Sequence, residues 1–311
     1  SSLRPFHSLV PDYKCCKKNV TLILTMPIQD ILNSIGFTIT HYEPVHGGDI
    51  SDAYCLYGQD AKYFLKVNDA QRYPGMFEKE ENGLRTLNQN SPLAIPQVIR
   101  CGNTLHQQYL LLEWLEKGSS GTGCWEDFGS GLAMLHQKKQ PFFGWQEDNF
   151  IGSLVQHNQP HEAWHLFYAE CRIMPLVTTL FNAGAFSKAD LVSAELFCKK
   201  MERLFPFEPP ALLHGDLWSG NFMVTGTGYA AIFDPAVYYG HREMDIGMTQ
   251  LFGGFDRRFY DAYNESYPLE KGWQQRMPLT QLYPLLVHAV LFGGHYVVSA
   301  KEIIKHYPGT G

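Results

Sequence analysis

Residues 212–222 have the sequence LLHGDLWSGNF, and residues 231–245 have the sequence AIFDPAVYYGHREMD. Asp216 and Asn221 lie five residues apart in the first stretch, and Asp234 follows an apolar pair in the second. A carboxylate can accept a proton, and carboxylate or amide oxygens are the ligands that Mg²⁺ prefers. The pattern therefore predicts a site that brings one base and two metal ligands to the same point.

Short apolar segments surround these polar residues. Residues 222–224 and 230–233 predict two strands of a hairpin that is closed by the Thr-Gly-Thr-Gly turn at 225–228, and residues 211–213 predict another short strand. Asp, Asn and Gly also gather in ordinary turns, because they tolerate left-handed backbone, so His-Gly-Asp alone is weak evidence. The complete ordered set is much less common.

The spacing of Asp216 and Asn221 is that of the catalytic Asp and the metal-binding Asn in the protein-kinase loop. In phosphoryl transfer a base accepts the proton of the attacking hydroxyl, and Mg²⁺ neutralises the phosphate charge. We therefore predict that Asp216 is the catalytic base and that Asn221 and Asp234 bind Mg²⁺.

Composition places limits on the function. The chain has 311 residues, 45% of them hydrophobic and 18% charged, which is typical of globular proteins. A net charge of -6 argues against a nucleic-acid partner, and no segment is a convincing membrane span. The seven cysteines are an odd, dispersed set in a chain too large to need disulfides, which favours reduced thiols in a cytoplasmic protein, and without CxxC spacing they argue against a metal site. We expect a monomer or a weak homodimer.

Two lobes of different character follow one another along the chain. Residues 1–25 form a poorly defined extension, and residues 26–116 predict a small β-rich lobe that begins with a helical pattern. This lobe shows a three-strand meander over 37–67, a helix over 77–87 and a strand pair that meets at 102–103.

A Gly/Ser-rich break over 117–123 is followed by helical periodicity. The expected helices cover 164–181, 188–204, 259–265 and the residues after 279. Residues 117–311 therefore predict a larger, mostly helical lobe that contains the catalytic hairpin. The fold class is α+β.

The first lobe offers candidates for binding the phosphates of ATP. Gly47, Gly48 and Ser51 lie between two predicted strands, where glycines allow the backbone to approach phosphates and the Ser51 hydroxyl can donate. An ordinary hairpin turn is the alternative for the Gly-Gly pair. Glu113 and Leu115 end the last strand of the lobe, where backbone groups would contact the adenine edge.

Lys66 lies within an apolar strand, where an unpaired ammonium would be costly to bury. Glu80 is the best candidate for its partner, because it lies on the helix that directly follows, as in the Lys-Glu pair of kinases. Glu78 and Glu81 remain possible by spacing, and a solvated strand position is the alternative for Lys66.

The chain resembles the fructosamine kinase family, a branch of the aminoglycoside phosphotransferase-like kinases, over roughly residues 28–305. The motifs that carry this resemblance are GGDIS at 47–51, FLKV at 64–67, FEKEENGLRTL at 77–87, LLEWL at 111–115, LAMLH at 132–136, GWQEDNFIGS at 144–153, HLFYAECRIMPL at 165–176, LLHGDLWSGN at 212–221 and FDPAVYYGHREMDIGMTQLFGGF at 233–255. The resemblance implies a bilobal protein-kinase-like fold.

It also implies the ATP- and Mg²⁺-dependent phosphorylation of the C3 hydroxyl of a ketosamine, small or protein-bound, followed by release of the amine. Carried over by position, Asp216 is the base, Asn221 and Asp234 hold Mg²⁺, and Lys66 with Glu80 positions the α- and β-phosphates. The candidates for the substrate pocket, or for bracing it, are Asp148, Asn149, Trp218, Arg242, Glu243 and Asp245. For Arg242 and Asp245, a buried clamp that supports the loop is the alternative.

Two other functions remain open. The first is a kinase of another small hydroxylated substrate, such as an aminoglycoside, choline or a sugar, and residues 144–176 would decide between them. The second is a nucleotide-binding module without catalysis, against which the intact set of Lys66, Asp216, Asn221 and Asp234 argues.

Overall fold

A computed structural model of the chain describes residues 28–45 and 50–307. The chain divides into two compact units, residues 1–36 and residues 37–311. The predicted extension over 1–25 lies outside the described residues.

The first unit contains helix α1, which spans Gln29–Ile35. Ile31 and Ile35 are buried and lie one helical turn apart, in agreement with the apolar spacing of the sequence. Gly36 ends the helix with a φ of 85°, in the left-handed region that glycine adopts at little cost.

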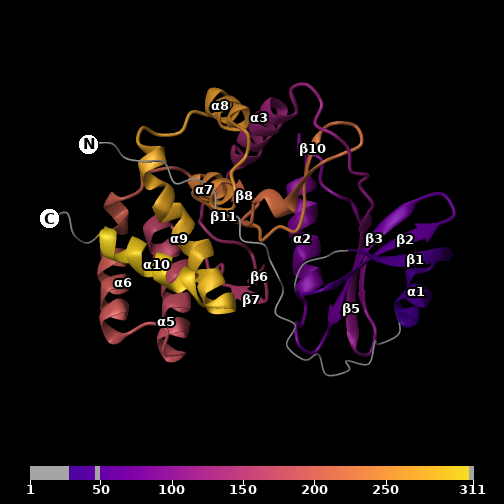
Figure 1. Ribbon diagram of the computed structural model, residues 1–311, viewed down its shortest axis with the longest axis horizontal. Helices are drawn as coiled ribbons and strands as arrows, with labels where there is room; N and C mark the ends of the chain where they lie inside the picture. The colour runs from indigo at the N-terminus through magenta and orange to yellow at the C-terminus, as the bar shows by residue number, and fades with distance from the viewer. Residues whose placement is uncertain (1–27, 46–49, 308–311) are drawn as a thin grey trace. The chain divides into compact units, whose positions relative to one another are not determined.

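The second unit begins with a five-stranded antiparallel sheet in the order β1-β2-β3-β5-β4. Its strands are β1 Ile39–Val45, β2 Asp52–Gly58, β3 Lys62–Asp69, β4 Val98–Asn103 and β5 Gln107–Glu113. Helix α2, Met76–Asn88, follows β3 and packs against β4 and β5 (Figure 1). The predicted meander, the inserted helix and the strand pair are confirmed.

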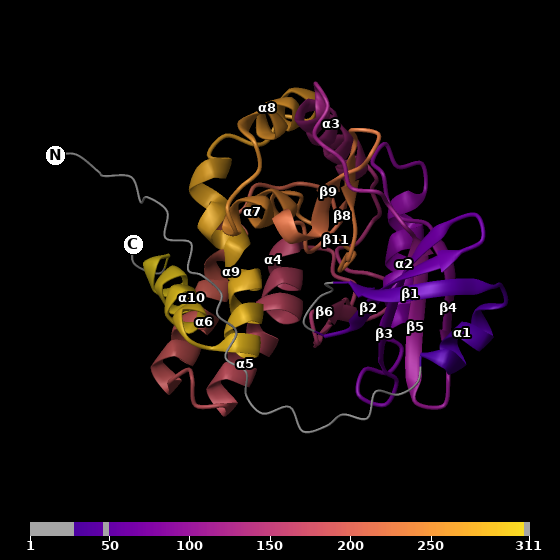
Figure 2. The ribbon, with the colours of Figure 1, turned by 45° about the vertical axis from the view of Figure 1, so that its right-hand side comes forward.

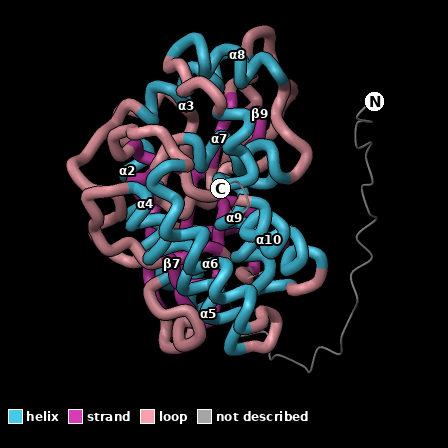
Figure 3. Tube along the Cα trace, turned by 90° about the vertical axis from the view of Figure 1, so that its left-hand side faces the viewer, coloured by secondary structure: helices cyan, strands magenta, loops and turns pink. Residues whose placement is uncertain are grey.

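The rest of this unit is mostly helical, which confirms the α+β, two-lobe prediction. Its helices are α3 Cys124–His136, α4 Trp164–Phe167, the π-helix Tyr168–Ile173, α5 Met174–Asn182, α6 Lys188–Lys200, α7 Glu243–Leu251, α8 Arg257–Ser266, α9 Trp273–Phe292 and α10 His295–His306, with short 3₁₀ turns at Met201–Arg203 and Ser219–Asn221. Helix α3 lies beside α8 (Figure 2), and α9 lies beside α10 (Figure 3).

Three short strand pairs lie within the helical lobe. They are β6 Asn149–Ile151 with β7 Leu154–Gln156, β8 Ala211–Leu213 with β11 Tyr238–Gly240, and β9 Phe222–Val224 with β10 Ala230–Ile232. The predicted β9–β10 hairpin is confirmed. The sequence analysis did not predict β11 or the β6–β7 hairpin.

The C-terminal apolar segment forms two helices. Helix α9 accommodates Pro278 and Pro284 and ends at Gly293, whose φ is 67°, and α10 begins after Gly294. Among the described residues, no helix is long and apolar enough to cross a membrane.

Two buried clusters form the core of the second unit. One lies among the helices of the C-terminal lobe and includes Phe167, Phe197 and Leu286. The other joins Phe77 of α2 to Leu212 of β8 and to residues of α3, β10 and α8. Because it contains residues from both lobes, this second cluster fixes α2 beside the catalytic strands. The lobe boundary after residue 116 stays a prediction.

Candidate active site

Buried groups hold the loop that follows β8. Gly215 has a φ of 84°, and Asp245 of α7 accepts hydrogen bonds from the main-chain N–H groups of His214, at 2.8 Å, and Gly215, at 2.9 Å. Nε2 of His214 lies 3.0 Å from the carbonyl oxygen of Phe233, and Nδ1 accepts from the N–H of Asp216 at 3.3 Å. Burial lowers the pKa of His214, so a neutral ring can make both bonds and order the loop.

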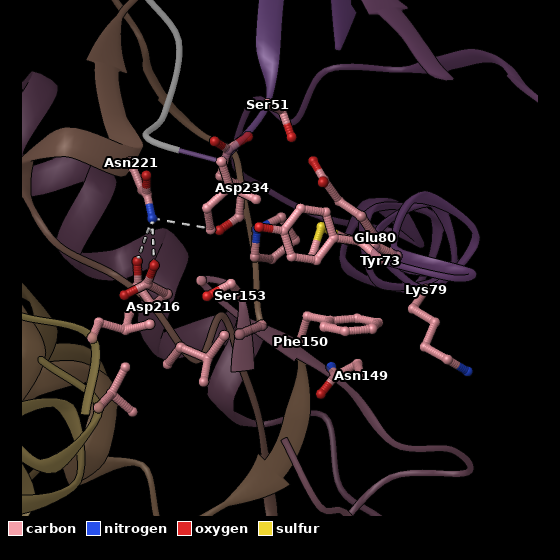
Figure 4. Close-up of a pocket in the computed structure, with 18 of the residues that line it drawn as sticks. Ser51, Tyr73, Lys79, Glu80, Asn149, Phe150, Ser153, Asp216, Asn221 and Asp234 are labelled. Carbon is pink, nitrogen blue, oxygen red and sulfur yellow. Dashed lines mark hydrogen bonds between the residues drawn. The ribbon is translucent and has the colours of Figure 1, made fainter. Parts of the chain in front are cut away.

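Asp216 and Asn221 meet at the floor of the cleft (Figure 4). The Asn221 amide nitrogen donates to Oδ2 of Asp216 at 3.0 Å and to its main-chain oxygen at 2.9 Å. Burial raises the pKa of Asp216 to about 7, with a contribution from the nearby charges of Asp234 and Asp245, while the hydrogen bond from Asn221 opposes the shift. A carboxylate with this pKa is well matched to accepting a proton near neutral pH.

Lys66 connects the two lobes through an ion cluster. Its Nζ lies 2.8 Å from each carboxylate oxygen of Glu80 and 3.1 Å from Oδ1 of Asp234. Burial by itself would lower the pKa of Lys66, but the charges of Asp234 and Glu80 raise it above its ordinary value. The structure thus pairs Lys66 with Glu80, whereas Glu81 pairs with Arg85.

The oxygens near Asp216 fit the needs of Mg²⁺. Asp234 keeps about a third of its side chain exposed and has a φ of 54°, a left-handed backbone that is unusual for a residue other than glycine. In the described residues no group of three His, Cys, Asp or Glu side chains forms a metal site. Mg²⁺ needs fewer protein ligands than such a group supplies, because it retains waters and accepts phosphate oxygens as ligands. Asp234 and the Asn221 amide oxygen are the residues that would hold it.

The ion cluster around Lys66 and the pair of Asp216 and Asn221 line one cleft, which has a volume of about 470 Å³. Its lining includes Ser51, Lys66, Glu80, Asn149, Asp216, Trp218, Asn221 and Asp234. The structure thus brings together eight of the predicted site residues, from both lobes. Gly47 and Gly48 lie outside the described residues.

A model of the fructosamine kinase family matches residues 27–308. The chain belongs to the fructosamine kinase family. A probable ketoamine kinase of Synechocystis is 41% identical over 272 residues, which cover 86% of this chain and 90% of that protein. A chloroplastic protein-ribulosamine 3-kinase of rice is 34% identical, over 86% of this chain and 79% of that protein. The family predicted from the motifs is confirmed.

Solved structures confirm the kinase-like fold of this fructosamine kinase family member. The putative fructosamine-3-kinase of Thermobifida fusca superposes with a TM-score of 0.81 at 33% identity, over 89% of this chain and 96% of that one. The aminoglycoside phosphotransferase APH(4)-Ia, in complex with AMP-PNP and hygromycin B, superposes with a TM-score of 0.60 at 15% identity, over 91% of this chain and 99% of that one. At this low identity the second likeness shows the fold alone.

Glu113 and Leu115, the candidates for adenine contacts, do not line the cleft that contains Asp216. They line a second hollow of about 580 Å³, with Tyr229 and other residues of the β9–β10 turn. The main-chain N–H of Glu113 donates to the carbonyl oxygen of Gln97. Their role in binding adenine therefore stays a prediction.

The residues that were predicted to bind the substrate of this family member lie in different parts of the structure. Asn149 and Trp218 line the cleft, together with residues of α9 and of the β6–β7 hairpin. Asp148 is outside the cleft lining and accepts hydrogen bonds from the ring of His157 and the N–H of Asn158. Asp148 therefore braces the hairpin.

Arg242 and Glu243 were candidates for the substrate pocket or for bracing it, and the structure places both in bracing positions, outside the cleft lining. Arg242 is buried and forms a two-point ion pair with Glu208, at 2.7 and 2.9 Å. Glu243 is fully buried and pairs with Arg276, the closer contact being 2.5 Å. A buried charge needs a partner of this kind, so both residues support the core beneath the loop and do not line the cleft.

Much of the cleft lining was missed by the sequence analysis, including Ser153, His288 and Phe292. Ser153 lies in the β6–β7 turn, and His288 and Phe292 lie one turn apart near the end of α9. Phe292 is 58% exposed, an unusual state for a phenylalanine. Ser153 belongs to the motif GWQEDNFIGS and could have been found from it, whereas the α9 residues show only ordinary helical spacing.

Proposed function

We propose that this protein is an ATP-dependent ketosamine 3-kinase, which transfers the γ-phosphoryl group of ATP to the C3 hydroxyl of a sugar-amine adduct. The main observation is the arrangement of the cleft. The ion cluster of Lys66, Glu80 and Asp234 lies beside the pair of Asp216 and Asn221. Membership of the fructosamine kinase family supports the choice of substrate.

Each residue has a separate task in the proposed reaction. The C3 oxygen attacks the γ-phosphorus, its O–H bond breaks, and Asp216 takes the proton. A bond forms between the γ-phosphorus and the C3 oxygen while the bond from the γ-phosphorus to the bridging oxygen breaks, and ADP leaves. Lys66, oriented by Glu80, binds the α- and β-phosphates. Mg²⁺, held by Asn221 and Asp234, would neutralise charge on the phosphate oxygens.

The product would be unstable. We propose that the product loses a proton from C1 to form a C1=C2 enaminol, whose electrons expel the phosphate from C3. Water then hydrolyses the C1 imine that remains, which gives the free amine and a deoxy-dicarbonyl sugar. We further propose that the enzyme is cytoplasmic, a monomer or a weak homodimer, and that it accepts small or protein-bound ketosamines. The five free cysteines of the described residues support the reducing compartment.

An ATP-consumption screen tests this function. Fructose-, ribulose- and erythrulose-amines are compared with choline and an aminoglycoside, at equal concentration and with Mg²⁺ present. We expect turnover with at least one ketosamine and release of its amine. Turnover with only choline or the aminoglycoside would contradict the proposal, and Asp216→Asn serves as the control for contaminating kinases.

A further inference from the structure

A loop of the C-terminal lobe holds helix α2 at the turn that carries Glu80. Glu147 lies just before β6, and its Oε2 is 2.7 Å from Nζ of Lys79. Its Oε1 accepts a hydrogen bond from the side chain of Asn82, also at 2.7 Å. Both oxygens are therefore engaged by residues that flank Glu80 on the same helix, so Glu147 ties this turn of α2 to the C-terminal lobe.

This contact is partly shielded from water. The side chains of Glu147 and Lys79 are each 28% exposed. Burial would raise the pKa of Glu147, but the hydrogen bonds from Lys79 and Asn82 outweigh it and hold the pKa below its usual value. Glu147 is therefore an anion at neutral pH and attracts the ammonium group of Lys79.

The main chain at Glu147 is itself fixed by a buried polar network. The Asn158 side chain donates to the carbonyl oxygen of Glu147 at 3.0 Å and accepts from Nη2 of Arg172 at 2.8 Å. Arg172 is fully buried in the π-helix, and its guanidinium carbon lies 4.1 Å from the centre of the Tyr238 ring. Hence the Glu147 carboxylate extends from a rigid part of the lobe.

The same hairpin is bonded to the segment that carries Asp234. The Asn149 amide donates to the carbonyl oxygen of Val237 at 2.8 Å, and the Gln156 amide donates to that of Ala236 at 3.0 Å. Glu147 is two residues before Asn149. One rigid element therefore contacts α2 through Glu147 and the chain after Asp234 through Asn149 and Gln156.

We propose that Glu147 is a positioning residue for phosphoryl transfer. By holding α2 against the C-terminal lobe, it sets the separation of Glu80 and Asp234 so that Lys66 meets both carboxylates, at 2.8 and 3.1 Å. An exposed ion pair with no such role has little effect on stability or on binding. This inference rests on the proposed function for its effect on turnover, but its effect on nucleotide binding is independent of the substrate.

The test compares Glu147→Ala with a matched control on the same helix. Arg85→Ala breaks the ion pair between Arg85 and Glu81 on α2, which lies away from the cleft. Because Lys79 itself lines the cleft, the charge exchange Lys79→Glu with Glu147→Lys, which restores an ion pair with reversed polarity, is compared with Lys79→Glu alone. The measurements are the Kd for MgADP by calorimetry, the KM for ATP, the KM for the ketosamine, kcat, and the thermal midpoint.

We expect Glu147→Ala to raise the Kd for MgADP and the KM for ATP by about tenfold and to lower kcat, with little change in the ketosamine KM. The thermal midpoint should stay within about 2 °C of the wild type, as for the loss of one partly exposed ion pair. Arg85→Ala should match the wild type, and the charge exchange should recover most of the lost affinity.

If Glu147→Ala and Arg85→Ala had the same Kd for MgADP, KM for ATP and kcat, the proposal would be overturned. It would also be overturned by a folded charge-exchange variant that binds MgADP no better than Lys79→Glu alone. A wild type that turns over no ketosamine would count against the proposed function alone, because MgADP binding is measured without a ketosamine.

Discussion

Asp216 is expected to control the rate through its carboxylate. Replacing it by Asn keeps the size of the side chain but removes the proton acceptor, so Asp216→Asn should lower kcat by about 10² or more. MgADP should still bind, because Lys66, Glu80 and Asp234 remain. Steady-state kinetics and calorimetry check the two parts. Retained turnover in the purified variant would refute the role of Asp216 as the base.

The same substitution should stabilise the protein at neutral and alkaline pH. The pKa of Asp216 rises from 3.8 to about 7 on folding, so the folded state favours the protonated carboxyl. The stability that protonation confers is fully present below pH 3.8 and is lost as the pH rises to about 7. Thermal midpoints of Asp216→Asn and wild type should therefore converge near pH 4 and separate, with the variant higher, by pH 8. If the difference between the two thermal midpoints became smaller as the pH rises, the raised pKa of Asp216 would be contradicted.

Arg242 should matter for folding more than for substrate binding. Arg242→Met leaves the Glu208 carboxylate buried without its partner, which is expected to reduce the free energy of unfolding by about 3–5 kcal/mol. Denaturant titration measures this loss, and Arg242→Met with Glu208→Leu should recover part of it. A variant of normal stability with a raised ketosamine KM would restore the pocket role that the sequence suggested.

The contrast between Asp216 and Arg242 shows what a single sequence can indicate at this scale. Asp216, Asn221 and Asp234 were found because their spacing along one hairpin reflects the chemistry they share. Arg242 and Glu243 are adjacent charged residues in the family motif, but their partners, Glu208 and Arg276, lie 34 and 33 residues away. No local pattern identifies such distant partners, so the sequence could not decide between a pocket role and a buried clamp.

The catalytic loop depends on a close approach of two backbones. A Cβ on Gly215 would lie 2.0 Å from the carbonyl oxygen of Ala236, and the φ of 84° is left-handed. Gly215→Ala should therefore displace the loop, abolish most of the activity and cost more than the 1–2 kcal/mol or so of left-handed strain alone. Gly184→Ala is the matched control, because Gly184 has a φ of 75° and no atom within 4 Å of an added Cβ. Equal losses of activity in the two variants would contradict this account.

Longer elements were predicted better than short ones. The helix at 76–88 and most strands of the sheet show apolar spacing over seven or more residues. This length is enough to distinguish the repeat of a helix from the alternation of a strand. Strands β6, β7 and β11 have three residues each, too few to show any period, whereas the equally short β9 and β10 were found from the turn at 225–228 that joins them. The β6–β7 hairpin is tied to residues 236 and 237 by the side-chain amides of Asn149 and Gln156, contacts between segments about 80 residues apart in the sequence.

Nucleotide binding should stabilise the molecule as a whole. Lys66 belongs to the β-rich lobe and Asp234 to the helical lobe, so MgATP held by both would join them. MgADP at 100 times its Kd should add about 2.7 kcal/mol to the free energy of unfolding, and EDTA should remove most of this gain. In Asp234→Ala the nucleotide effect should no longer depend on Mg²⁺. A thermal-shift titration measures these changes, and an unaltered Mg²⁺ dependence would exclude Asp234 as a ligand.

The position of Trp218 has a practical consequence. The chain contains six tryptophans, all within the described residues, and Trp218 is the one that lines the cleft, with its ring 5.6 Å from that of Phe252. Indole emission shifts with the polarity of its surroundings. Trp218 therefore gives this enzyme an intrinsic optical signal for occupancy of the cleft, and subtracting the spectrum of Trp218→Phe would isolate it without any attached dye.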